Sequence, residues 1–160
     1  MLIMNNNSLS GSINLNCSAM KNLTSLGLGS NQFHVPISRN LSGCLRLEAI
    51  NLARNHLNAG VPVTLKNLQS LTQLSVSNSS LHNLSATLEV LGHCKLKYSS
   101  RHNQSKGSIP KWLSRRKKLQ MLDLSWNHLS GSIPSWFGKF DNLFYLDLSN
   151  NSFTGNNHRV

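Results

Sequence analysis

A phrase that recurs every 24 residues constrains the fold of this chain more than any other feature. Residues 122–134 read LDLSWNHLSGSIP and residues 146–155 read LDLSNNSFTG, so equivalent positions lie 24 residues apart. The same phase runs back to the N-terminus, where apolar residues occupy the Ile133 position of every earlier unit except one, which has Ser85. A strict period of this length predicts an array of stacked structural units.

Each unit carries a short alternating pattern that is typical of a β-strand. Leu122 and Leu124 alternate with Asp123 and Ser125, which directs the leucines to one face and the polar side chains to the other. One such strand cannot bury its leucines alone, so neighbouring units are expected to stack as a parallel sheet. Asn127 and its counterparts then turn the chain inward, where a side-chain amide can bond backbone groups that would otherwise lack partners.

The rest of each unit is predicted to return the chain across the other side. Gly131 and Pro134 provide the bend, and apolar residues at helical spacing follow, for example Phe137, Phe140 and Leu143 or, in an earlier unit, Leu65, Leu68 and Leu71. The whole pattern, L-x-L-x-x-N-x-L-x-G-x-I-P, resembles the leucine-rich repeat.

The predicted fold class is therefore an α/β leucine-rich repeat solenoid of plant-type repeats. Its parallel β-sheet should form the concave face, with short helical or 3-10 turns on the convex side. We expect one domain over residues 1–160, with about six to seven repeats that are incomplete at both ends. Residues 95–106 are predicted to be an irregular repeat, because only Leu96 and Tyr98 are available there to be buried.

Positive charge is concentrated in one part of the sequence. Sixteen Lys and Arg oppose five Asp and Glu, a net charge of +11, and nine of the cations lie between Lys95 and Lys118. A basic surface favours anionic partners, but no nucleic-acid-binding motif accompanies the charge and aromatic residues are not interleaved with it. We therefore expect no binding to nucleic acid. The run SRRKK, residues 114–118, is interpreted as a solvated convex face.

Sequons for N-glycosylation point to a secreted parent protein, although no signal peptide or membrane-spanning segment is recognisable in the sequence. Eight N-x-S/T sequons are present. Asn103 is expected in a buried position of the asparagine ladder. The other seven are the candidate glycosylation sites: Asn6, Asn16, Asn22, Asn40, Asn78, Asn83 and Asn150.

Three cysteines are present. Cys44 follows Leu41, and Cys94 follows Leu91, at helix-like spacing, so both are predicted to be small buried hydrophobic residues. Cys17 lies one repeat and one turn from Cys44, which leaves a Cys17–Cys44 bridge open as an alternative.

The pattern predicts neither an enzyme nor a cofactor or metal site. Histidines that share a repeat phase lie at least two repeats apart, too far to share a metal ion. Asp123 and Asp147 share a phase in adjacent repeats and resemble a pair of catalytic carboxylates. Aspartate is common at this exposed strand position, however, so we interpret the pair as part of the repeat pattern.

Function is then expected on the concave face, which is formed by residues between and just after the strand leucines. These residues are small, polar or aromatic, and they would let an extended ligand approach the sheet. Trp126 and Tyr145 offer rigid contact area at low entropic cost. The candidate ligand-binding residues are Asn78, Asp123, Ser125, Trp126, Tyr145, Asp147 and Ser149.

The G-x-I-P form of the repeat resembles the extracellular domains of plant receptor kinases. The runs LIMNNNSLSGSINLNC, NLARNHL, LSVSNSSL and LFYLDLSNNSFTG resemble the phytosulfokine receptors in particular, over most of residues 2–94 and 107–155. The resemblance implies an extracellular, membrane-anchored parent that binds a short tyrosine-sulfated peptide on its inner face. It also implies an island domain between later repeats and a co-receptor kinase as a second partner. Sulfate would suit Arg54 or Arg101.

The chain departs from that family in extent. It starts in mid-repeat at Leu2, and NNHRV replaces the expected continuation after Gly155. We therefore expect a truncated ectodomain fragment without island, membrane span or kinase domain, and with no membrane contact of its own. The alternative function is that of a generic leucine-rich scaffold for protein–protein interaction, or of a receptor relic without function.

Overall fold

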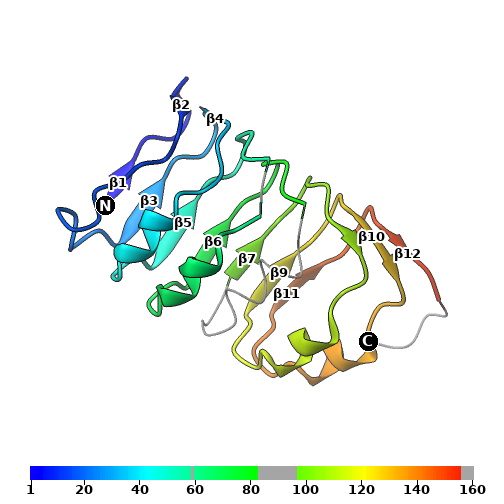
Figure 1. Ribbon diagram of the computed structural model, residues 1–160. Helices are drawn as coiled ribbons and strands as arrows, with labels where there is room; N and C mark the ends of the chain where they lie inside the picture. The colour runs from blue at the N-terminus through cyan, green and yellow to red at the C-terminus, as the bar shows by residue number, and fades with distance from the viewer. Residues whose placement is uncertain (59, 83–96, 156–160) are drawn as a thin grey trace.

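The backbone winds into a solenoid whose coils are joined by one parallel sheet (Figure 1). The computed structural model describes residues 1–58, 60–82 and 97–155. Its main sheet has seven strands in sequence order: β1 (Leu2–Ile3), β3 (Ser25–Gly27), β5 (Ala49–Asn51), β6 (Gln73–Ser75), β7 (Lys97–Ser99), β9 (Met121–Asp123) and β11 (Tyr145–Asp147). Paired residues are 24 positions apart along the whole sheet, from Leu2 with Leu26 to Leu122 with Leu146. Equivalent side chains of successive repeats therefore stack in columns.

Two smaller parallel sheets lie beyond the asparagine turn, and the sequence analysis missed them. One pairs β2 (Ser10–Gly11) with β4 (Gln32–Phe33), and the other joins β8 (Lys106–Gly107), β10 (His128–Gly131) and β12 (Ser152–Phe153). Partners here are 22 residues apart, as in Ser10 with Gln32 and Ser130 with Ser152. A shift of two residues per coil keeps each side chain on its own face of the sheet, because side chains alternate with a period of two.

The predicted helical turns are single 3-10 segments of five residues: η1 (Arg39–Gly43), η2 (Val63–Asn67), η3 (Lys111–Arg115) and η4 (Ser135–Lys139). Figure 1 shows them following one another along the lower margin of the solenoid. Pro62, Pro110 and Pro134 precede the last three, where the fixed φ of proline suits a helix start. In the described part of the chain no helix has the length and apolar character to cross a membrane.

The core confirms the predicted register of the strand leucines. Leu28, Leu52, Val76 and Leu124 are at most 1% exposed, whereas Leu148 in the last described coil is half-buried. Burial of one such side chain contributes roughly 1.5–3 kcal/mol, and only stacking of neighbouring coils provides it. The repeat is therefore the unit that the hydrophobic effect stabilises.

The repeat predicted to be irregular joins the main sheet in register. Tyr98 pairs with Leu74 on one side and Leu122 on the other, and it is 1% exposed. Ser100 occupies the second inward position of this repeat, where the following repeat has Leu124. Ser100 is also 1% exposed. A large tyrosine beside a small serine fills the space of two leucines, and the two side chains form a hydrogen bond. The strand at residues 97–99 thus pairs in register like those of the other repeats, while residues 95–96 lie outside the described residues.

A disulfide joins Cys17 to Cys44, with a Cα–Cα distance of 4.8 Å. The prediction that Cys44 is an unbonded hydrophobic residue is therefore wrong, although its side chain is 1% exposed as expected. Cys94 lies outside the described residues. The bridge spans 27 residues, one repeat plus three positions, so it ties the turn at Cys17 to the end of η1 in the next coil.

Candidate functional site

In every coil, the residue immediately before the ladder position has a left-handed backbone. These residues are 24 positions apart and have φ between 51° and 57°: Asn6, Ser30, Arg54, Asn78, His102, Trp126 and Asn150. Such a φ is uncommon for a residue other than glycine, and for bulky side chains it is a marked exception. The surrounding coils must therefore hold the backbone in place at this column, which we call the left-handed column.

The asparagine ladder supplies that restraint. The Asn127 side-chain amide donates to the carbonyls of Leu124 at 3.1 Å and of Ser100, in the preceding coil, at 2.8 Å, while its oxygen accepts from the Ser105 amide at 3.2 Å. The backbone N–H of Trp126 donates to the next coil, at the Ser149 carbonyl. Trp126 is thus fixed on both sides, and its side chain is directed outward.

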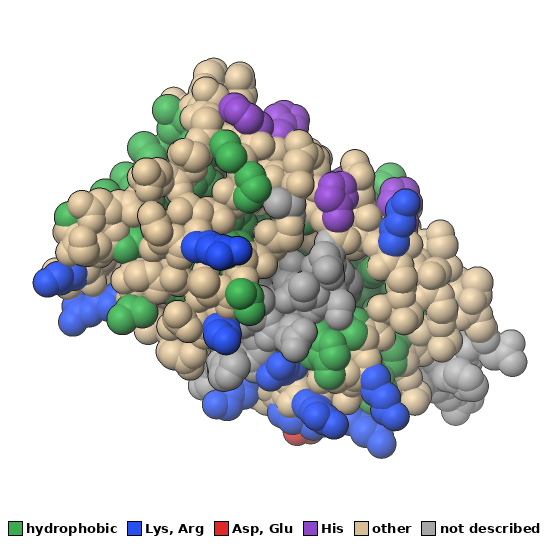
Figure 2. Space-filling model, in the orientation of Figure 1, with side chains coloured by type: hydrophobic (Ala, Val, Ile, Leu, Met, Phe, Trp, Pro, Cys, Tyr) green, Lys and Arg blue, Asp and Glu red, His purple; other side chains and the backbone are tan. Residues whose placement is uncertain are grey.

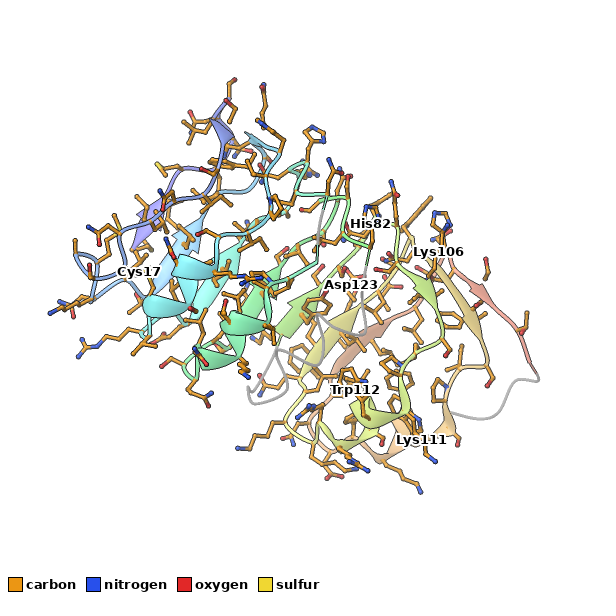
Figure 3. The ribbon with its side chains drawn as sticks, viewed as in Figure 1. Cys17, His82, Lys106, Lys111, Trp112 and Asp123 are labelled. Atoms are coloured by element: carbon orange, nitrogen blue, oxygen red, sulfur yellow. A yellow bond between two sulfur atoms is a disulfide. The ribbon has the colours of Figure 1, made fainter. Side chains whose placement is uncertain are left out.

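Side chains of the left-handed column line a continuous groove. One hollow is bordered by Ala53, Arg54, Ser77, Asn78, Ser99, Arg101, His102 and Asp123. A second, which shares Asn78 and His102 with the first, continues to Trp126, His128 and Asn150. Figure 3 places Asp123 over the middle of the sheet and His82 at its rim. The structure thus brings together three predicted site residues, Asn78, Asp123 and Trp126, and adds Arg101 and His102.

The groove contains an ordered aromatic pair. The rings of His102 and Trp126 stack with centroids 4.7 Å apart and an interplanar angle of 16°. Trp126 is 46% exposed, so one face of the stack remains open to a ligand. The pairing follows from the 24-residue spacing of the two residues, and the same spacing in the sequence could have revealed it.

The strand aspartates are held by serines two residues further on. Asp123 Oδ1 accepts from the Ser125 hydroxyl at 2.7 Å and from the Ser125 amide at 3.1 Å. Asp147 and Ser149 repeat this geometry, with distances of 2.7 Å and 3.0 Å. Ser125 is only 1% exposed. Its prediction as a ligand contact is therefore corrected, since its hydroxyl is buried and orients Asp123.

Serines of earlier coils extend this polar row across the sheet. The hydroxyls of Ser77 and Ser99 lie 2.7 Å apart, and Ser99 Oγ lies 3.3 Å from Asp123 Oδ2. Ser77 Oγ also accepts from the Arg101 amide at 3.1 Å. The floor of the groove is therefore satisfied internally, which leaves Arg54, Arg101 and Trp126 at the walls to contact a ligand.

The three remaining candidates, Tyr145, Asp147 and Ser149, lie on or just after the last strand of the sheet and are not among the residues that line the two hollows. Tyr145 is 44% exposed, and its hydroxyl approaches Asp147 Oδ2 at 3.5 Å. The negative charge of Asp147 is the main cause that raises the pKa of Tyr145. The positive charge of Arg101 lowers the pKa of both Tyr145 and Asp147. Arg101 therefore belongs to the same electrostatic environment as these two residues.

Ser149→Ala is predicted to raise the pKa of Asp147. Hydrogen bonds from the Ser149 hydroxyl and amide hold that pKa below its usual range, against desolvation, and the substitution removes the first of them. A carboxylate with a depressed pKa stabilises the fold above its unfolded-state pKa, and this contribution is lost as the pH falls through the folded-state pKa. NMR titration of the Asp147 carboxyl measures the change, with Ser130→Ala as the control. An unchanged midpoint in Ser149→Ala would contradict the assignment.

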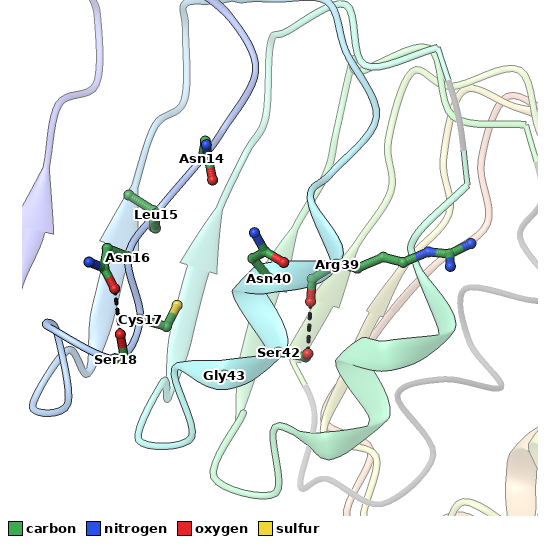
Figure 4. A pocket seen from close by; sticks show the side chains of 9 residues that line it. All are labelled: Asn14, Leu15, Asn16, Cys17, Ser18, Arg39, Asn40, Ser42 and Gly43. Atoms are coloured by element: carbon green, nitrogen blue, oxygen red, sulfur yellow. Dashed lines mark hydrogen bonds between the residues drawn. The ribbon is translucent and has the colours of Figure 1, made fainter.

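Six of the seven candidate glycosylation sites are exposed: Asn6, Asn16, Asn22, Asn40, Asn78 and Asn150. Asn16 and Asn40 border one hollow beside Cys17, where the Ser18 hydroxyl donates to Asn16 Oδ1 at 2.6 Å (Figure 4). Asn83 lies outside the described residues. Asn103 is 4% exposed and bonds the backbone of neighbouring repeats, which suits a ladder residue. Glycosylation at the exposed sites stays a prediction.

Within residues 1–58, 60–82 and 97–155, no group of three or more His, Cys, Asp or Glu could hold a metal ion. The paired aspartates are bonded to serines, and Asp123 borders the groove. This arrangement suits recognition of a polar ligand.

Comparison with known proteins agrees with the geometry. The family model described as "Leucine rich repeat" matches residues 101–153. The extracellular chain of the receptor kinase HAESA from Arabidopsis, solved with the peptide hormone IDA and the co-receptor SERK1, superposes with a TM-score of 0.76 at 31% identity over 91% of this chain. This chain has the leucine-rich repeat fold.

Two further relatives show how widely the leucine-rich repeat fold is used. Phytosulfokine receptor 1 of Arabidopsis thaliana is 48% identical over 89 residues, which cover 39% of this chain and 9% of that receptor. A plant ice-binding protein superposes with a TM-score of 0.76 at 28% identity, over 95% of this chain and 49% of its own. This chain spans 25% of the HAESA chain, so it corresponds to a segment of these longer proteins.

Proposed function

We propose that this chain is a segment of the extracellular leucine-rich repeat domain of a plant peptide-hormone receptor. It binds an extended, tyrosine-sulfated peptide of the phytosulfokine type in the groove along the left-handed column. A co-receptor kinase then joins the complex, outside the cell at the plasma membrane. The observation that carries the proposal is a single groove with arginines at one end and a stacked aromatic pair at the other.

The chemistry of the groove matches such a peptide. Arg54 and Arg101 border the hollow that adjoins His102, so sulfate groups find cations there. Tyrosine rings of the ligand pack on the open face of Trp126. Polar groups that line the groove, such as Asn78 and Gln104, bond the extended backbone of the peptide. The likeness to Phytosulfokine receptor 1, and to a receptor kinase solved with its peptide hormone, supports this choice of ligand class.

Calorimetric titration with sulfated and unsulfated forms of one tyrosine peptide tests the proposal. Because the groove is shallow and its walls are exposed, a bound peptide stays half solvated and loses its conformational freedom. We expect affinity for the sulfated form in the high micromolar range, on the order of −5 kcal/mol, and weaker binding of the unsulfated form. Trp126→Ala and Arg101→Gln should each abolish measurable binding.

Control variants outside the groove test whether loss of peptide binding is specific to groove residues. Arg39→Gln removes an exposed arginine from η1, and Phe144→Ala removes an exposed aromatic residue from the opposite margin of the sheet. Both should bind the sulfated peptide like the original chain. Equal, undetectable binding of both peptides would remove the receptor proposal and favour a generic interaction scaffold.

A further inference from the structure

Lysines and arginines gather on the 3-10 side of the later coils, away from the groove. This basic face consists of Lys111, Arg115, Arg116, Lys117, Lys118 and Lys139, from η3, the turn after it and η4. Figure 2 shows Lys and Arg side chains concentrated along the lower edge of the molecule. The sequence has no Asp or Glu between residues 90 and 122, and Asp141 is the acidic residue beside the face in η4's coil. The positive field there is thus weakly compensated.

Aromatic rings are interleaved with the cations of this region in space, contrary to the interpretation of the sequence. The Arg116 guanidinium lies 5.4 Å from the ring centroid of Trp112, which Figure 3 shows next to Lys111. Lys117 lies 5.6 Å from the ring of Phe140. Phe140 belongs to the following coil, so the linear sequence separates residues that the solenoid brings together.

One cation of the basic face, Lys117, is held by contacts between coils. Lys117 Nζ donates to the Lys139 carbonyl at 2.9 Å, and the Asn142 amide donates to the Lys117 carbonyl at 2.8 Å. Like charges that are held close together repel one another, and an anionic ligand relieves this repulsion. Because Arg116 and Lys117 are already positioned against the rings of Trp112 and Phe140, a ligand loses less entropy in ordering these two side chains. A solvated surface needs no such arrangement.

We propose that the basic face binds a linear acidic polysaccharide, a chain of sugars with regularly spaced carboxylates. This inference is independent of the proposed function, because the face lies on the other side of the coil from the groove. Carboxylates meet the lysines and arginines, and the sugar rings pack against the edges of Trp112 and Trp136, which are half-buried.

The same geometry disfavours the two other common polyanions. Bases of single-stranded nucleic acid stack on open aromatic faces, but cations already lie over the rings of Trp112 and Phe140. Anionic membranes attract basic surfaces by charge, and stable binding adds the insertion of exposed apolar side chains; Phe140, the ring beside Lys117, is only 9% exposed. A polysaccharide needs neither feature.

Binding of alginate, a polymer of uronic acids, to immobilised full-length chain tests the inference. The triple variant Lys111→Gln, Arg115→Gln and Lys118→Gln should lower the affinity at least about tenfold and flatten its salt dependence. The matched control is Lys21→Gln, Arg39→Gln and Lys66→Gln, which removes the same charge from exposed positions of earlier coils. It should change the affinity by less than about threefold. Neutral dextran should not bind.

The outcomes separate a defined face from general electrostatics. Equal losses of alginate affinity in the two triple variants would overturn the inference, because net charge alone would then explain binding. If single-stranded DNA or phosphatidylserine vesicles bind more tightly than alginate, and this binding is lost in the first variant, the assignment to a polysaccharide is overturned. Sulfated-peptide binding should be unchanged in the first variant, so failure of this test is distinct from failure of the groove.

Discussion

Leu124→Ala is expected to destabilise the chain by about 2–5 kcal/mol. Leu124 is fully buried, and its column neighbour in the preceding coil is Ser100, whose small side chain cannot move in to fill the cavity. The substitution therefore removes transfer free energy and leaves a void between coils. Urea unfolding followed by circular dichroism measures the change in the free energy of unfolding.

Leu148→Ala is the matched control for this prediction. Leu148 occupies the same repeat position in the next coil but is only half-buried, so its loss should cost less than half as much. An effect of Leu124→Ala below about 1 kcal/mol would mean that the repeats are not packed as the structure indicates.

The repeat period was sufficient to predict the main sheet. Residues of equal phase, such as Leu26, Ile50, Leu74 and Leu122, lie in one column because every coil uses the same number of residues. Even the segment expected to be irregular keeps its strand in register, since Tyr98 takes the place of a leucine. The small Ser100 makes room for the large Tyr98 beside it and forms a hydrogen bond with its side chain. The periodicity of apolar residues does not predict such a pair.

The 24-residue period could not predict contacts between residues at different positions of the repeat. Cys17 and Cys44 are 27 residues apart, so periodicity aligns Cys17 with Leu41 and gives no reason to prefer the bridge. The second set of sheets pairs residues 22 apart, and the cation–ring pair of Lys117 and Phe140 joins neighbouring coils. Each depends on the path of the chain between strands.

The groove was predicted in part, although His102 and Trp126 share a repeat phase and the 24-residue spacing could have revealed their stacking. Trp126 was recognised as an exposed concave residue, but its partner His102 and the left-handed backbone that both share follow from how the asparagine ladder turns the chain. Ser125 was expected to face a ligand because it follows a strand leucine. It is buried because its small side chain turns back to Asp123, to which its hydroxyl donates at 2.7 Å, whereas the longer Arg101 at the same repeat position is exposed.

Asn127→Ala is expected to lower the free energy of unfolding by about 3 kcal/mol, because it leaves the buried Ser105 amide and Ser100 carbonyl without their partner. Asn127→Ser should cost less, since Ser79 occupies the equivalent position of an earlier coil and its hydroxyl donates to the Leu52 carbonyl at 2.9 Å. Asn151→Ala makes the same deletion at a part-buried site, where water can replace the amide. Urea unfolding of the three variants should therefore rank Asn127→Ala as the least stable. If Asn151→Ala cost as much as Asn127→Ala, burial would not be what makes the ladder stabilising.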